Sequence, residues 1–155
     1  MVILTAQEIE RHLKERAFAT VVTANGGSMA SRTMMFGFVA PDAVYLITRS
    51  DSAKIGHIRS RSSGLLHLSG QGDDLSAAFD ISVRGAFQEI APDSTHYQTG
   101  VGVLAAKNPM VRDIAGSSMR DAYTMLKLNV SEIQGWTYQQ AADGLPKTQW
   151  SGGPQ

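Results

Sequence analysis

Hydrophobic and polar residues alternate along much of this chain with the two-residue period of β-strands. The alternation is clearest at 79–84 (FDISVR), which continues to about residue 90, and at 126–131 (LKLNVS) inside a longer segment, 123–138. Successive strand side chains point to opposite faces, so these segments predict strands with one face in the core. Apolar and β-branched runs predict four more strands, at 18–24, 28–39, 44–48 and 65–69.

Three segments have the longer period of helices. Residues 5–16 place apolar side chains near one face, with Thr5 as the cap and Glu8 three positions later. A short helix is predicted at 52–61, capped by Ser50 or Asp51, and a longer one at 92–114 that breaks near Asn108-Pro109. The sequence Asn25-Gly26-Gly27 predicts a tight hairpin between the first two strands.

The 155 residues fit one compact domain, which we expect over 1–140, and the glycine- and proline-bearing segment 141–155 is expected to be a loose tail. About six strands with short connections, and little strand–helix–strand rhythm, favour an antiparallel barrel with helices at its ends. The expected fold class is therefore mainly β with peripheral helices.

Composition excludes several function classes. The formal net charge is zero, which argues against nucleic-acid binding, and no run of about eighteen apolar residues predicts a membrane span. There is no cysteine, and the four histidines are scattered, so no metal site is expected. The N-terminus lacks the features of a secretory signal, and we expect a cytoplasmic protein.

The strongest candidate site follows the predicted strand at 44–48. Ser52 and Lys54 lie at the start of the next helix, where free backbone N–H groups and the helix dipole favour an anion. Four basic residues against one acidic residue give this region a local charge of +3: Arg49, Lys54, Arg59 and Arg61 against Asp51. An ordinary capped surface helix with solvated basic side chains explains the same segment.

A second candidate segment is 31–36 (SRTMMF). On a strand, Arg32 shares one face with Met34 and Phe36, while Thr33 shares the other with Met35. Arg32 is placed to bind a phosphate and Thr33 to bond a ring edge. The alternative is an exposed arginine beside a methionine-rich core strand.

Taken together, these pieces resemble the pyridoxamine 5′-phosphate oxidase-like split barrels, in particular the shorter general-stress and flavin-binding members. The resemblance covers about 4–90 well and 123–136 more weakly. The segments that carry it, in order, are Ala19–Thr23, Asn25–Gly27, Ser31–Met34, Tyr45–Thr48, Ser52–Ile55, Arg59 and Leu65–Leu68.

The resemblance implies a six-stranded antiparallel split β-barrel that works as a homodimer and binds FMN at the subunit interface. In that family pattern, Arg32 and Lys54 hold the phosphate and Ser52 assists at the helix start. The remaining implied cofactor contacts are Thr33, Met34 and Met35 along the ring and ribityl chain, Ile47 and Thr48 at the ring edge or phosphate end, and Asp80 from the second subunit.

This chain departs from authentic pyridoxamine phosphate oxidases at several positions. It has Ala53 where they have an arginine, Gly37 where they have a lysine, and no Arg/His-bearing motif at its end. We therefore expect an FMN-dependent oxidoreductase acting on some other small molecule, with no catalytic side chain named. A non-catalytic flavin carrier or sensor, or a binder of F420 or haem, is the alternative. Trp136 is expected to close the barrel, and Trp150 is the candidate for a lid.

Overall fold

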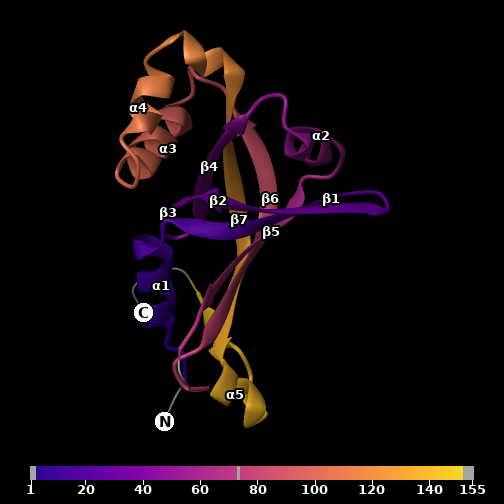
Figure 1. Cartoon of the computed structure of the whole chain (residues 1–155), viewed down its shortest axis with the longest axis vertical. Helices are drawn as coiled ribbons and strands as arrows, with labels where there is room; N and C mark the ends of the chain where they lie inside the picture. The colour runs from indigo at the N-terminus through magenta and orange to yellow at the C-terminus, as the bar shows by residue number, and fades with distance from the viewer. Residues whose placement is uncertain (1–2, 73, 152–155) are drawn as a thin grey trace.

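The computed structural model describes residues 3–72 and 74–151, which form one curled antiparallel sheet with helices around it (Figure 1). Six strands have seven or more residues, and two have only three. This confirms the expected fold class. In sheet order the strands are β2 (Ser28–Met35), β1 (Phe18–Asn25), β5 (Ser63–Gly70), β6 (Phe79–Ile90), β7 (Tyr123–Thr137), β4 (Ala43–Arg49) and β3 (Gly37–Val39), with β8 (Thr148–Trp150) paired to β7.

The single strand predicted over 28–39 is wrong, because the chain breaks at Phe36. The Phe36 N–H donates to the carbonyl of Ala17 at 3.0 Å, and its side chain is fully buried. The residues before it form β2 at one edge of the sheet, and those after it form β3 at the other. A chain that joins both edges in this way curls the sheet into a barrel with a split along its side.

The helices cap and cover this sheet. Thr5 and Glu8 form the predicted capping box of α1 (Ala6–Glu15), and the hairpin turns at Gly26, whose φ is +59°. Ser52 is the N-cap of α2 (Ala53–Ser60), so the predicted caps Ser50 and Asp51 are wrong by one or two positions. The predicted break in the third helix separates α3 (Thr95–Ala105) from α4 (Met110–Ala115), and a 3₁₀ turn follows at Ser118–Ala122.

Two apolar clusters fill the molecule. The larger lies inside the barrel and includes Leu46, Leu66 and Ile81, all fully buried. The smaller lies where α3 packs against β4 and β7, with α4 packed on α3, at the opposite end of the molecule from α5 (Figure 1). The barrel and the helical layer therefore share β4, the strand that leads into the candidate site.

The expected loose tail after residue 140 contains regular structure instead. The expected boundary between residues 140 and 141 falls inside α5 (Tyr138–Ala142). β8 then pairs with β7. The Trp150 ring meets the edge of Phe38 with centroids 5.5 Å apart, at the side of the main core. Trp150 therefore helps to close the barrel.

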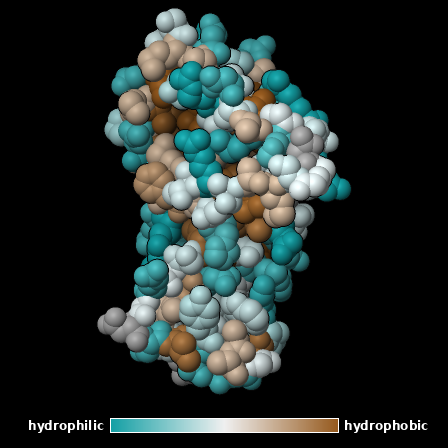
Figure 2. All heavy atoms as spheres, turned by 45° about the vertical axis from the view of Figure 1, so that its right-hand side comes forward, coloured by the Kyte–Doolittle hydropathy of each residue, from teal (hydrophilic) through white to brown (hydrophobic). Residues whose placement is uncertain are grey.

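The face drawn in Figure 2 is mixed in character. Hydrophilic and intermediate residues are interspersed over it, and strongly hydrophobic side chains show in separate patches. The large apolar side chains that are exposed belong to different elements: Phe18, Met29, Leu75, Met110, Met119 and Tyr138. Among residues 3–72 and 74–151, no helix is both long and apolar enough to cross a bilayer.

Candidate functional site

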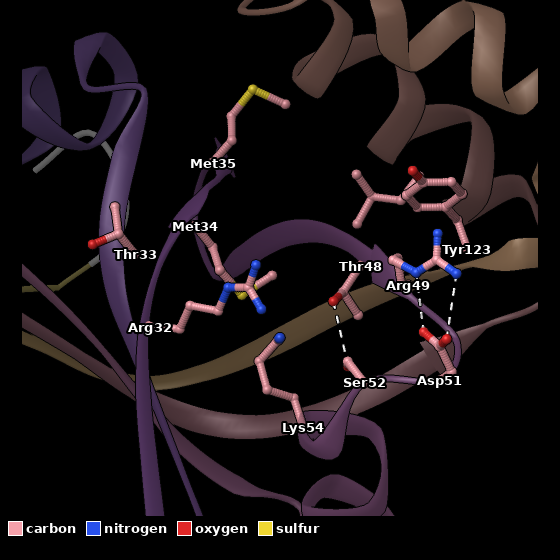
Figure 3. A pocket seen from close by; sticks show the side chains of 11 residues that line it. Arg32, Thr33, Met34, Met35, Thr48, Arg49, Asp51, Ser52, Lys54 and Tyr123 are labelled. Atoms are coloured by element: carbon pink, nitrogen blue, oxygen red, sulfur yellow. Dashed lines mark hydrogen bonds and ion pairs between the residues drawn. The ribbon is translucent and has the colours of Figure 1, made fainter.

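The split of the barrel opens into a pocket of about 480 Å³ between β2 and β4. β3 pairs with β4 only from Ala43 to Tyr45, so among the described residues no strand pairs with the later part of β4 on that side. β2 is the other edge of the sheet. The residues that line the pocket, shown in Figure 3, are Arg32, Thr33, Met34, Met35, Ile47, Thr48, Arg49, Asp51, Ser52, Lys54 and Tyr123.

Two cations face each other across this pocket. Arg32 comes from β2 and Lys54 from the first turn of α2, and their charged ends point toward one another (Figure 3). Lys54 is only 6% exposed, and burial lowers its pKa below the usual value, with the charge of Arg32 lowering it further. Within the described part of the chain, neither side chain has a carboxylate at ion-pair distance. Such a pair is stabilised by an anion bound between its members.

Hydroxyl groups and a helix start complete the polar side of the pocket. Thr48 Oγ1 donates to Ser52 Oγ at 3.4 Å, and the Ser52 side chain makes no capping bond to its own helix. In the first turn of α2, the N–H of Ile55 donates to the carbonyl of Ser52 at 3.2 Å, and the N–H groups of Ala53 and Lys54 come before it. Two hydroxyls, two cations and the start of a helix converge there, as expected for a phosphate site.

The other side of the pocket is apolar. Met34 is packed into the barrel core, while Met35 and Ile47 pack against the cluster under α3. Three flexible or branched apolar side chains beside a polar end suit a ligand with a flat ring at one end and an anion at the other.

The rim of the pocket carries an ion pair. Arg49 Nε lies 3.1 Å from Asp51 Oδ1, and Arg49 Nη2 lies 3.3 Å from Asp51 Oδ2. These bonds and the charge of Arg49 hold the pKa of the Asp51 carboxyl below its usual value. Tyr123 stands beside Arg49 in Figure 3, and the two residues are paired across β7 and β4.

The structure brings eight of the nine sequence-predicted site residues to this pocket, and Asp80 alone is elsewhere. Asp80 lies on β6, with Oδ1 at 3.5 Å from Nε2 of His67. Sequence reasoning named no role for Tyr123, which enters the site through strand pairing. Trp150 and Trp136 also lie outside the lining of this pocket, and Trp150 packs on Phe38 instead; the lid role of Trp150 stays a prediction.

The local excess of positive charge is smaller than the sequence suggests. Arg49 is paired with Asp51, and Arg59 forms two hydrogen bonds with Glu89 at 2.9 and 3.1 Å. Arg32 and Lys54 are thus the cations of the lining that a ligand meets unpaired. This concentrates the anion site at the start of α2.

Histidines do not contribute to the pocket lining. His57 bonds Thr23 at 3.1 Å, and His96 lies 3.4 Å from the hydroxyl of Tyr45. His12 stacks on a core phenylalanine, and burial lowers its pKa. Over the described residues, no three His, Asp or Glu side chains come close enough together to hold a metal ion.

Solved structures share this architecture. General stress protein 26 of Bacillus anthracis aligns over 84% of this chain and 92% of its own, with 20% identity and a TM-score of 0.63. An FAD-binding protein of Mesorhizobium loti covers 86% and 93%, at 12% identity and TM-score 0.68. The haem storage protein HutZ of Vibrio cholerae covers 82% and 91%, at 9% identity and TM-score 0.68.

No protein-family model and no curated protein sequence matches this chain. The structural comparisons show that the chain has the split-barrel fold of these structures. The resemblance to the pyridoxamine 5′-phosphate oxidase-like split barrels is thereby confirmed at the level of the fold.

Proposed function

We propose that this chain is an FMN-binding flavoprotein. The observation that carries the proposal is a pair of cations with no carboxylate partner among the described residues: Arg32 on β2 and Lys54 in the first turn of α2 face each other in a pocket with one apolar side. A phosphate monoester bound there neutralises both cations and accepts the hydrogen bonds that Ser52 and the first N–H groups of the helix offer.

The chain's own residues hold and orient the cofactor in this proposal. Met34, Met35 and Ile47 exclude water beside the ring, and Thr33 and Thr48 offer hydroxyls at its edge. The flavin supplies the hydride or electron chemistry when it is bound, and the protein sets its position and surroundings. The proposed activity is hydride or electron transfer to or from a small molecule. The cytoplasmic location stays a prediction of the sequence.

The proposal includes a homodimer, because the pocket is open along the split of the barrel. Asp80 lies outside the pocket of its own protomer, so its predicted place near the cofactor requires a second copy of the chain. Sedimentation or light scattering of the purified protein measures the mass directly. If the protein binds FMN as a strict monomer, Asp80 is not part of the proposed site. The proposed phosphate site is unaffected by that result.

Haem and F420 are the competing ligands. The fold hosts a haem storage protein, HutZ, but the pocket described here has no histidine in its lining. F420 has an extended anionic tail, for which the sequence offers Arg49, Arg59 and Arg61. Arg49 and Arg59 already hold carboxylates, and neither Arg59 nor Arg61 lines the pocket. These observations favour FMN. Parallel titrations with FMN, F420 and haem compare the three ligands, and tightest binding of haem or F420 would contradict the proposal.

A turnover assay distinguishes a catalytic flavoprotein from a protein that only carries or senses flavin. We expect FMN-loaded protein to oxidise NADH or NADPH, or to reduce a small acceptor, faster than the same concentration of free FMN. A protein that binds FMN at one per chain but adds nothing to the rate of free flavin is a carrier or sensor. That result would contradict the oxidoreductase part of the proposal alone.

A further inference from the structure

The carboxylate of Asp51 is paired with the guanidinium of Arg49 at the rim of the pocket, beside the cations of the proposed phosphate site. Both oxygens of the carboxylate meet the guanidinium, at 3.1 and 3.3 Å, and both residues line the pocket (Figure 3). This bidentate pair uses N–H donors with which an arginine otherwise binds a phosphate. Of the three cations in the lining, Arg49 is therefore the one that is already paired with a carboxylate.

The charges of the lining fit one phosphate group. Three cations stand against one carboxylate, so the pocket carries a net charge of +2. A phosphate monoester carries roughly −1.5 to −2 near neutral pH, which matches Arg32 and Lys54. A second anionic group further along the same ligand would reach a rim where Arg49 is neutralised and Asp51 is negative.

We propose that Asp51 restricts the pocket to ligands that carry a single phosphate group, by keeping Arg49 from binding a second one. The inference rests on the proposed flavin function and goes beyond it by naming a selectivity residue. It separates FMN from FAD, whose second phosphate and nucleoside extend past the first. The same fold serves an FAD-binding protein of Mesorhizobium loti, so the fold itself does not set this choice.

The test compares the affinities for FMN and FAD in four proteins at low ionic strength. They are the wild type, Asp51→Asn, the double variant Arg49→Gln/Asp51→Asn, and the matched control Glu89→Gln. The control also removes one carboxylate from an arginine pair, that of Arg59, but neither of its residues lines the pocket. Because Asp51 lies in an exposed turn, we expect all four proteins to fold.

We expect Asp51→Asn to improve FAD binding relative to FMN by about two- to fivefold, the range that one exposed charge pair represents. The double variant should return the ratio to that of the wild type, and Glu89→Gln should not move it. An unchanged ratio in Asp51→Asn, an equal rise in Glu89→Gln, or a rise that survives the loss of Arg49 would each overturn the selectivity role while FMN binding stands. A wild type that binds neither flavin would remove the proposed function and this inference together.

Discussion

The ammonium group of Lys107 donates a hydrogen bond to the carbonyl oxygen of Phe36 at 2.8 Å and lies 4.2 Å from the centre of the Phe36 ring. It also donates to the carbonyl of Arg16. Phe36 is the residue at which the chain passes from β2 to β3, directly after the pocket residues Met34 and Met35. A lysine seventy-one positions away therefore fixes the end of the strand that lines the site.

Replacing Lys107 with methionine tests this connection. The variant keeps the apolar stem but leaves the carbonyls of Phe36 and Arg16 without their donor, so we expect a loss of about 1–3 kcal/mol in the free energy of unfolding. FMN affinity should fall as well, because the end of β2 is less well held. Urea unfolding and flavin titration measure the two effects. Lys14→Met, which removes an exposed lysine of α1, is the control, and equal behaviour of the two variants would contradict the role of Lys107.

The same lysine gives the stability a pH dependence. Burial lowers the pKa of Lys107 to about 8 from the ordinary 10.5 of an unfolded chain. Between these values the unfolded chain binds a proton that the folded chain has released, so the free energy of unfolding rises with pH across this window. Urea unfolding of the wild type and Lys107→Met at pH 7, 8, 9 and 10 isolates the contribution as a difference. A difference that stays constant with pH would contradict the lowered pKa.

Lys54→Met tests the phosphate site. Losing one charge-assisted contact should weaken FMN binding by roughly 1.5–3 kcal/mol, or about ten- to a hundredfold, while riboflavin, which has no phosphate, binds as before. Equilibrium dialysis with both ligands gives the two affinities. Lys127→Met serves as the control, since Lys127 is not part of the lining. Equal losses for FMN and riboflavin would place Lys54 away from the phosphate.

Gly37 stands where authentic pyridoxamine phosphate oxidases have a lysine, and the packing of α3 explains the glycine. A Cβ at this position would lie 2.6 Å from Cγ1 of Val103. We expect Gly37→Ala to lower the free energy of unfolding by about 1–3 kcal/mol through overpacking. Val103→Ala in the same chain should recover part of this loss, and thermal unfolding of the single and double variants measures it. A double variant with purely additive losses would contradict the contact.

The sequence-based predictions succeed where neighbouring residues decide the structure. The capping box of Thr5 and Glu8, the hairpin at Gly26 and the helix after Ser52 all depend on residues a few positions apart. The two segments of the candidate site were predicted for the same reason. The strand pattern predicted a barrel, but only the family resemblance indicated that these two segments meet in one site.

The predictions fail where residues far apart in the sequence determine the local structure. The break at Phe36 depends on Ala17 and Lys107, and the one local sign of it is Gly37, a residue that also occurs within continuous strands. Glu89 neutralises Arg59 across thirty positions, and Tyr123 reaches the pocket through its register with Arg49. The short strand β8 has turn-rich neighbours, and its pairing to β7 alone defines it.

The absorbance spectrum of the purified protein, before and after addition of FMN and removal of the excess by gel filtration, tests the central claim most directly. We predict a retained flavin band at about 450 nm, with one flavin per chain, because the identity of the cofactor sets the spectrum. Riboflavin carried through the same procedure should be retained less, since it lacks the group that Arg32 and Lys54 bind. A protein that retains no FMN would contradict the account.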